Sequence, residues 1–509
     1  MIASLFAATA PFAGPSVDWY HLSPLLILLG GGLVLLVGAA LTGERWPNGG
    51  VAFLSVTTSS AAAVLAVFLW HDVTDHGTKS LMGRAISLDH FSLFLIIVIC
   101  VASLLTSLFL DQYLRREGLD GPEVHALVLM SAVGGVVMAM SNDMIVLFLG
   151  LETLSLALYV LAASHLRRLN SQEAAIKYFV LGGFSSAFFL YGIALVYGAT
   201  GSTNFTDIRT FLDANVLTQK QGSGMLLAGF ALLLVGLAFK VAAAPFHSWV
   251  PDVYEGSPSP VSGFMASAAK AAGFAALLRV FVLTFANRVD DWRPVLYVLA
   301  IVTLVVGSVV AVVQTNVKRM LAYSSISHAG YILVGVEAAS DRGTAGALFY
   351  LLAYAVMVLG TFGVITVLGK LGDDEHDLST YKGLSKRRPV LALVFTLFLL
   401  AQAGVPFTSG FWAKAGVISA AAARGDGYGY SVAVVAMLCA AIAAFLYLRI
   451  VKTMFFDDPD PDGEVVAAPR IPLSAGLALT LASAFTLAVG VAPGFVIDLA
   501  RHAVPTLAR

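Results

Sequence analysis

Charged residues are scarce in this chain of 509 residues: Asp, Glu, Lys and Arg make up only 12% of it, whereas hydrophobic residues make up 58%. This composition excludes an ordinary water-soluble globule, in which about a quarter of the residues are charged. The net charge of −1 provides no basic surface for a nucleic acid. Apolar stretches of roughly 18 residues or more, long enough to cross a bilayer as helices, recur along the chain. We therefore predict an integral membrane protein without a nucleic-acid partner.

Cysteine is nearly absent as well, and the two that occur, Cys100 and Cys439, lie in apolar segments and are interpreted as packing residues. The chain has no P-loop, no dinucleotide fingerprint and no pattern for ligating iron–sulfur clusters, haem or flavin. "HDVTDH" at 71–76 and "DDEHD" at 373–377 contain metal-type residues without a closed ligand set, so both are interpreted as solvated loops. We therefore expect neither a metal nor a cofactor in this chain.

About fourteen apolar segments have the length of membrane-spanning helices. They lie near residues 24–41, 51–70, 88–110, 124–140, 143–163, 174–198, 224–246, 260–285, 295–314, 320–338, 343–370, 390–421, 431–456 and 473–498. The longest polar connections, at 199–223, 371–389 and 457–472, are short enough to be interhelical loops. The sequence thus predicts an all-α integral membrane fold, a single polytopic domain over residues 1–509.

Two of these segments contain a proline in similar surroundings, Pro245 in "AAAPFHSW" and Pro406 in "AGVPFTSGFW". Proline interrupts a helix, and non-helical backbone at membrane depth is tolerated only beside protein or water. A pair of broken helices in corresponding positions indicates an internally duplicated transporter. We expect two five-helix repeats, helices 4–8 in residues 124–285 and helices 9–13 in residues 295–456, the second inverted because five is odd. Three helices in residues 1–123 precede them, and one at 473–498 follows.

Four ionisable residues fall inside apolar segments: Glu152, Lys240, Lys270 and Lys414. A charge at the bilayer centre costs about 2.5–3.5 kcal/mol even on lenient scales. A lone lysine near a helix end can reach the headgroups, but Lys240 lies about 16 residues into its segment. The four charges are therefore expected to share one hydrophilic track, the alternative being paired charges that only fix helix packing.

The motifs around these residues resemble a known family. They are "GLETLSLALYVLAAS" with Glu152, "GLAFKVAAAPFHSWVPDVYEGSPSPVSGF" with Lys240, "ASAAKAAGF" with Lys270, and "QTNVKRMLAYSSISHAGY" at 314–331. They are similar to the antiporter-like membrane subunits of proton-pumping NADH:quinone oxidoreductase, respiratory complex I, and most similar to its subunit N (subunit 2) branch. The resemblance covers essentially the whole chain. Lys414 stands where the subunit M branch carries a glutamate.

The resemblance implies a proton path coupled to electron transfer that takes place elsewhere in the complex. Glu152 would pair with Lys240, and opening that pair would push a proton towards Lys270 and then Lys414. NADH, flavin, iron–sulfur clusters and quinone would be bound by other subunits. The expected partners are the lipid bilayer and neighbouring membrane subunits, namely subunit M and small subunits such as K and J.

Four further residues are candidates for proton relay or uptake, each with a plainer alternative. His328 could bridge the lysines or be a satisfied packing histidine. His247 could line the break or bond to loop backbone. Glu173 and Lys177, at the start of the sixth segment, could form a solvated pair or take part in proton uptake. Lys318 and its neighbour Arg319 are interpreted as anchors at the cytoplasmic face.

Loop lysines and arginines predict the orientation, with a modest bias that favours both termini on the outer side of a bacterial inner membrane. "YLRR" at 113–116, "LRR" at 166–168, "VKR" at 317–319 and "SKRR" at 385–388 would then be cytoplasmic. Alternative functions are a subunit of a multisubunit cation/proton antiporter or hydrogenase-type complex, and an autonomous secondary transporter. A purely structural scaffold would leave the four central charges unexplained.

Overall fold

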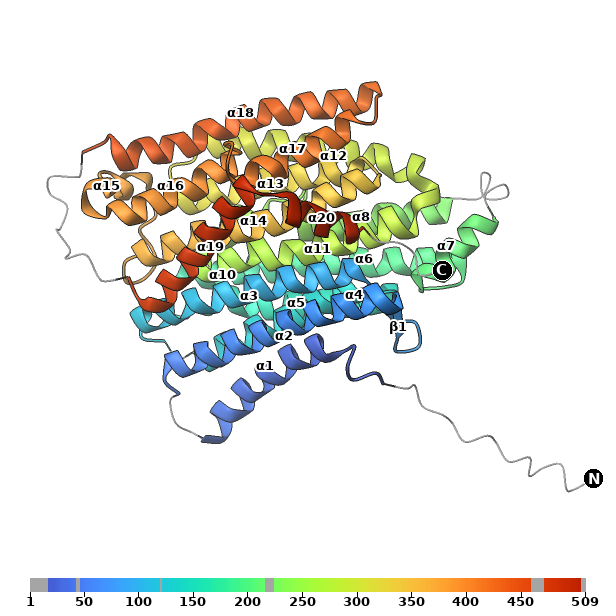
Figure 1. Ribbon diagram of the computed structural model, residues 1–509, viewed down its shortest axis with the longest axis horizontal. Coiled ribbons are helices and arrows are strands. Elements are labelled where there is room, and N and C mark those ends of the chain that lie inside the picture. The colour runs from blue at the N-terminus through green and yellow to red at the C-terminus, as the bar shows by residue number, and fades with distance from the viewer. Residues whose placement is uncertain (1–16, 43–45, 120, 216–223, 459–470, 505–509) are drawn as a thin grey trace, which may run out of the picture.

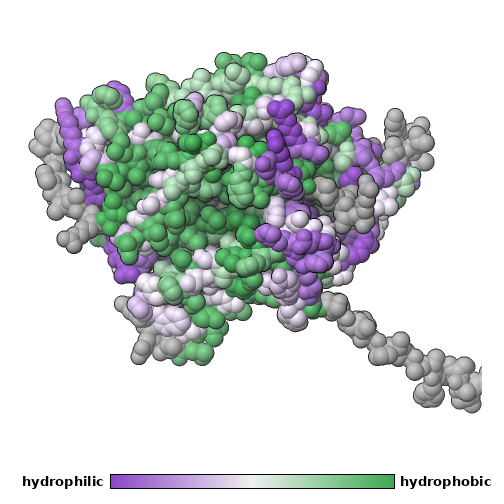
Figure 2. Space-filling model, in the orientation of Figure 1, coloured by the Kyte–Doolittle hydropathy of each residue, from purple (hydrophilic) through white to green (hydrophobic). Residues whose placement is uncertain are grey.

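The computed structural model is a bundle of long helices that run roughly side by side (Figure 1). It describes residues 17–42, 46–119, 121–215, 224–458 and 471–504. Figure 2 shows a hydrophobic band across the middle of the visible face, with hydrophilic side chains gathered at the two ends of the helices. This is the distribution that a lipid bilayer requires of a protein that spans it.

The first half of the chain supplies eight helices and a short hairpin. They are α1 (Ser23–Thr42), α2 (Asn48–His76), β1 (Lys79–Leu81), β2 (Ile86–Leu88), α3 (His90–Glu117), α4 (Pro122–Met140), α5 (Met144–Ala162), α6 (Leu169–Thr200), α7 (Phe205–Ala214) and α8 (Gly224–Val241). β1 and β2 pair antiparallel, with Lys79 opposite Leu88.

The second half begins with α9 (Trp249–Gly256) and one continuous helical stretch from Ser259 to Thr284. That stretch consists of α10 (Ser259–Phe264), η2 (Met265–Ala269), α11 (Lys270–Leu277) and η3 (Leu278–Thr284), of which η2 and η3 are π-helical. It is followed by η4 (Ala286–Arg288), α12 (Val289–Val312), α13 (Val317–Glu337), α14 (Asp341–Leu368), η5 (Leu378–Tyr381), α15 (Leu384–Arg387), α16 (Pro389–Ala403), α17 (Ser409–Ala422), α18 (Gly427–Phe455), α19 (Leu473–Val491) and α20 (Gly494–His502).

Polar residues fix where several helices begin, because their side chains accept the free N–H groups of the first turn. Asp89, Asp143, Asn316, Ser340 and Asp426 cap α3, α5, α13, α14 and α18 in this way. We call the end of the bundle where α3 and α14 finish and α13 begins the α15 end, and the opposite end the α7 end (Figure 1). α1 begins and α20 finishes at the α7 end.

Twelve helical segments of the described chain are long and apolar enough to cross a membrane, which confirms the predicted class of a multi-pass membrane protein. The remaining two predicted segments coincide with α13, whose first turn carries Lys318 and Arg319, and with the broken pair α16 and α17. The polar connection at 199–223 was expected to be a plain loop, but it contains α7, an amphipathic helix capped by Asn204. Of the connection at 457–472, residues 459–470 lie outside the described residues.

The centre of the bundle is formed by the stretch 259–284, α13 and α14, which are buried along almost their whole length. Small residues allow the closest approaches. A Cβ on Gly307 of α12 would lie 2.4 Å from the backbone nitrogen of Ser327, so only glycine permits α12 to pack this tightly against α13. The candidate residues predicted from the sequence therefore lie on helices that pack against one another along much of their length.

Candidate functional site

Lys240 lies in the last turn of α8, directly before a break in the helix. Ala242 adopts a left-handed backbone with φ of 66°, Pro245 has no N–H to continue the helix, and α9 begins only at Trp249. The carbonyl of Phe239, at the break, accepts the backbone N–H of Ala242 at 3.1 Å and the indole N–H of Trp249 at 3.2 Å. The predicted interruption at Pro245 is thus present, and it places Lys240 beside irregular backbone.

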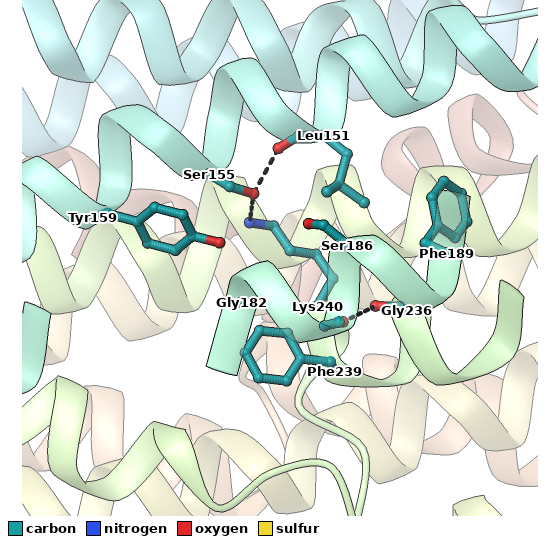
Figure 3. A pocket seen from close by; sticks show the side chains of 10 residues that line it. Leu151, Ser155, Tyr159, Gly182, Ser186, Phe189, Gly236, Phe239 and Lys240 are labelled. Atoms are coloured by element: carbon teal, nitrogen blue, oxygen red, sulfur yellow. Dashed lines mark hydrogen bonds between the residues drawn. The ribbon is translucent and has the colours of Figure 1, made fainter. Parts of the chain in front are cut away.

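The ammonium of Lys240 is buried between α5, α6 and α8 and donates to Ser155 Oγ at 2.8 Å (Figure 3). The hydroxyl of Ser155 donates a hydrogen bond to the carbonyl of Leu151, so its oxygen is oriented to accept from the lysine. A small pocket adjoins the lysine, lined by the hydroxyl groups of Ser155, Tyr159 and Ser186 and by apolar side chains. A polar pocket of this kind can admit water to the amine.

Glu152 lies on α5 one turn before Ser155, but it makes no ion pair with Lys240, although both residues belong to the described chain. Its Oε1 atom is buried without a hydrogen-bond partner among the described residues, while the side chain as a whole is half-buried. On the same helix, Leu149 and Leu156 are more than half exposed. The carboxylate therefore lies at an outer face of this chain, at membrane depth.

Lys270 begins α11, between the two π-helical segments, at the centre of the bundle. Its ammonium donates to both the carbonyl and the hydroxyl of Ser325 on α13, at 2.5 and 2.6 Å. It also faces the ring of Tyr354 at 5.5 Å. π-helical turns inside α-helices are frequently found at functional sites. A Cβ on Gly273 would lie 3.3 Å from Cγ of Lys240, so the helices that carry the two lysines pack directly against each other.

His328 lies next to Lys270 in a cluster of tyrosines contributed by α14 and α18. Its Nδ1 is 2.7 Å from the hydroxyl of Tyr350, and its Nε2 is 3.1 Å from that of Tyr447. The ring packs against Tyr354 at 4.5 Å. The histidine predicted as a relay is thus fully buried and bonded through both ring nitrogens to side chains that can exchange protons.

Lys414 lies on α17, after the second broken helix. Gly404 and Phe407 have positive φ angles of 90° and 66°, and Pro406 lies between them, so α16 ends at Ala403 and α17 starts at Ser409. Lys414 Nζ donates at 2.9 Å to the carbonyl of Ala403, which the break has freed. It also faces the ring of Tyr331 at 4.8 Å.

Lys177 and Glu173 form an ion pair of 2.7 Å at the start of α6. Lys177 has a second partner of equal distance, Asp252 on α9, which in turn binds Arg319 at 2.8 Å. The pair is therefore part of a half-exposed network between α6, α9 and α13 rather than an isolated solvated pair. His247 is half-buried just beyond Pro245, and its Nδ1 has no hydrogen-bond partner in the described part of the chain.

The structure changes two interpretations from the sequence. The "DDEHD" connection is solvated only in part: Asp374, Glu375 and Asp377 are exposed, but Asp373 and His376 are fully buried. Lys318, interpreted as an anchor at the cytoplasmic face, has a completely buried side chain that forms an ion pair with Asp373 at 3.3 Å. The sequence could not reveal this because the partners come from distant segments. No group of three or more His, Cys, Asp or Glu side chains in the described residues could hold a metal ion.

Sequence reasoning also missed the hydroxyl-bearing residues between the lysines, because a tyrosine or serine in an apolar helix does not stand out as a charge does. These residues are Ser155, Ser324, Ser325, Tyr331, Tyr350, Tyr354 and Tyr447. One signal was available: Tyr350 and Tyr354 are four residues apart and share one helix face.

Comparison with known proteins identifies the family. The family described as "NADH:quinone oxidoreductase/Mrp antiporter, TM" matches residues 141–455. A protein of Roseiflexus castenholzii named NADH-quinone oxidoreductase subunit N 2 is 44% identical over 497 residues, which cover 96% of this chain and 97% of that protein. This chain belongs to the family of NADH-quinone oxidoreductase subunit N. The subunit N resemblance stated from the motifs is therefore confirmed.

Solved structures agree with membership of the subunit N family. A chain of respiratory complex I from Thermus thermophilus with bound aureothin is 33% identical, with a TM-score of 0.77, over 94% of this chain and 99% of that chain. A chain of the Mrp complex from Dietzia has a TM-score of 0.82 over 96% of both chains but is only 22% identical, so that likeness shows the fold alone. The antiporter-like membrane fold predicted from the sequence is confirmed.

Proposed function

We propose that this chain carries a proton-translocation path through the membrane arm of an NADH:quinone oxidoreductase, coupled to electron transfer from NADH to quinone in other subunits. The observation that carries the proposal concerns Lys240, Lys270 and Lys414. All three are buried, and none has a carboxylate within 4.0 Å in the described part of the chain. Each donates to a neutral hydroxyl or carbonyl. A buried ammonium without a counter-ion is costly, so such lysines can store and release protons.

Packing contacts, joined by hydrogen bonds at some of the links, connect the lysines and support a path along them. Lys240 packs against the helix of Lys270 at Gly273, as described above. From Lys270 the chain of side chains continues through Tyr354 and His328 to Tyr350. Tyr350 stacks on Tyr331 with ring centroids 6.1 Å apart, and Tyr331 faces Lys414. The residues proposed to transfer protons are Glu152, Lys240, Lys270, His328 and Lys414, with water completing the gaps.

Glu152 has a role of its own in the proposal. It lies within electrostatic range of Lys240 without a direct contact, so movement of either side chain changes how strongly the carboxylate stabilises the ammonium. Because the carboxylate is half-buried on an outer face at membrane depth, it needs a polar neighbour. We propose that a neighbouring membrane subunit, of the K, J or M type, covers this face, and that lipid covers the apolar faces elsewhere.

Orientation, proton uptake and the repeats belong to the same proposal. The basic sequences at 113–116, 166–168, 317–319 and 385–388 lie at the α15 end, which we assign to the cytoplasm of a bacterial cell, with both termini outside. Glu173, Lys177 and Asp252 would collect protons there, and His247 would line the break.

In each of the two predicted repeats of five helices, the fourth helix is broken. α4 and α12, the first helices of the two repeats, start at opposite ends of the bundle, which supports inverted repeats over residues 124–285 and 295–456.

The test uses the assembled complex in membrane vesicles carrying Lys240→Ala, with NADH-driven proton pumping and NADH:quinone electron transfer measured together. Lys452→Ala is the matched control, since Lys452 is exposed at the end of α18 and makes only a long ion pair of 3.9 Å. We expect both activities to fall in the first variant and to stay normal in the control. Normal pumping in an assembled Lys240→Ala complex would refute the path.

A self-contained cation/proton antiporter or solute transporter is the competing function, and the same fold would serve it. The purified chain reconstituted alone in liposomes separates the two possibilities. We expect no cation- or solute-driven proton movement from the chain by itself. Robust exchange activity without partner subunits would favour the transporter.

A further inference from the structure

A buried carboxylate, that of Asp373, joins the two halves of the bundle at the α15 end. Asp373 lies in the connection after α14 and is 0% exposed. Its Oδ2 accepts the backbone N–H of Ser259 at 3.1 Å and the ammonium of Lys318 at 3.3 Å. The hydroxyl of Ser259 also donates to it at 3.0 Å. Other charged or titratable neighbours are His376 at 3.1 Å and the guanidinium groups of Arg116 and Arg168, each at 3.8 Å. The buried hydroxyl groups of Tyr113 and Tyr381 also lie within electrostatic range of the carboxylate.

These contacts reach the two helices that meet at the central lysine. Ser259 opens the continuous stretch that carries Lys270 eleven residues later. Lys318 lies in the first turn of α13, seven residues before Ser325. Two helical turns, about 10 Å, therefore separate Lys318 from the acceptor of Lys270 along α13. Lys270 and Ser325 are bonded at 2.5 and 2.6 Å, a fit that tolerates little relative sliding of the two helices.

We propose that Asp373 is a positioning residue for proton transfer at Lys270: its carboxylate fastens the starts of the Ser259–Thr284 stretch and of α13 to each other and so holds Lys270 against Ser325. The inference rests on the proposed proton path and adds to it a residue that touches neither the lysine nor the tyrosine cluster. In this proposal the connection 369–377 sets the register between the Ser259–Thr284 stretch of the first predicted repeat and α13 of the second.

The charge of Asp373, and not only its shape, is required for this role. Burial by itself would raise the pKa of the Asp373 carboxyl, but the charge of Lys318 and the hydrogen bond from His376 lower it below the ordinary value. The group is therefore ionised at neutral pH. An asparagine could still accept the N–H of Ser259, but it would leave the buried ammonium of Lys318 without an ion-pair partner, whereas Arg116 and Arg168 would keep Glu117 and Asp374. Lys318 would retain its bond to the carbonyl of Ser257 at 2.7 Å, but the attachment of α13 at its first turn would be weaker.

The test compares Asp373→Asn with Asp374→Asn in the assembled complex. Asp374 is the neighbouring carboxylate, also contacts Arg168, and is 61% exposed, so its loss removes a similar charge without touching Ser259 or Lys318. For Asp373→Asn we expect pumping and NADH:quinone activity to fall roughly three- to tenfold. We also expect the alkaline limb of the activity–pH profile to move to lower pH, because the ammonium of Lys270 loses its acceptors at Ser325. Amide hydrogen exchange in residues 318–328 should accelerate. Asp374→Asn should leave the two activities, the pH profile and the hydrogen exchange unchanged.

The following results decide whether the proposal stands. An assembled Asp373→Asn complex with a normal pH profile and normal exchange in α13 overturns the proposal, as does equal behaviour of the two variants. If Asp373→Asn does not assemble, Ser259→Ala takes its place, since this change removes one hydroxyl and keeps the backbone N–H. Its activity–pH profile must then shift in the same direction by a smaller amount. An unshifted profile overturns the proposal. Lys270→Ala separates the two levels of inference. Normal pumping in that variant refutes the proton path itself, whereas a normal Asp373→Asn beside an inactive Lys270→Ala refutes only the positioning role.

Discussion

Gly410 is the residue at which a single methyl group should disable the second broken helix. A Cβ at this position would lie 1.8 Å from the carbonyl oxygen of Ala401 and 2.7 Å from its carbonyl carbon. Both atoms are backbone and cannot rotate away. To restore an ordinary contact, α17 must move away from α16 by about 1.5 Å, far beyond what close-packed interiors absorb.

That displacement acts directly on Lys414, since α17 carries the lysine and α16 ends at its acceptor, Ala403. A hydrogen bond of 2.9 Å does not survive a separation of this size. Misplacing a reacting group by about 1 Å can cost on the order of a hundredfold in rate, so we expect Gly410→Ala to lower coupled pumping by at least about tenfold. Overpacking should also cost about 1–3 kcal/mol of stability.

The assay is NADH-driven proton pumping in membrane vesicles, with assembly of the complex checked on native gels. Gly416→Ala is the matched control: it lies on the same helix, and the nearest atom to its new Cβ would be Gly346 Cα at an ordinary 3.7 Å. We expect Gly416→Ala to pump normally. If Gly410→Ala assembles and pumps as well as Gly416→Ala, the contact between α16 and α17 does not set the geometry of Lys414, and the reasoning fails.

Three further predictions concern other parts of the molecule. Tyr447→Phe removes the hydroxyl bonded to His328 and should lower pumping several-fold, which corresponds to the loss of about 1 kcal/mol of hydrogen bonding. Asp89→Ala leaves the fully buried Arg279 without its partner at 2.8 Å, and should destabilise the complex by about 3–5 kcal/mol in thermal denaturation. Because the pKa of Asp373 is lowered despite its burial, its contacts are stable above the ordinary carboxyl range and are lost only in stronger acid. Amide protection of residues 370–377 should therefore be the same at about pH 5 and about pH 4, where an ordinary carboxyl would be partly protonated.

Each of these predictions has a control in the chain. Tyr428→Phe alters an exposed tyrosine and should leave pumping unchanged, so equal losses in Tyr428→Phe and Tyr447→Phe would contradict a role for the His328 contact. Asp290→Ala alters an exposed carboxylate and should leave the melting temperature of the complex unchanged. If Asp290→Ala and Asp89→Ala lower the melting temperature equally, the buried ion pair is not the cause of the loss. Loss of amide protection near pH 4 would contradict the lowered pKa of Asp373.

The sequence by itself determined the membrane class, the positions of the helices and the two breaks. These features depend on local properties: runs of apolar residues of bilayer length, and a proline that cannot donate a backbone hydrogen bond. It also singled out Glu152, Lys240, Lys270 and Lys414, because a charge inside an apolar run is conspicuous without any knowledge of its neighbours. The motifs around them were enough to indicate the family.

Only the tertiary structure decided which groups these charges meet. Lys240 binds Ser155 and not Glu152, a tyrosine cluster surrounds His328, and the connection that resembled a solvated loop buries Asp373. Each of these contacts joins residues far apart in the chain or on separate helices. Helical periodicity predicts which face a residue occupies, but hydroxyl, carbonyl and carboxylate oxygens can all accept from an ammonium. The partner is therefore chosen by the packing of whole helices, which no local pattern encodes.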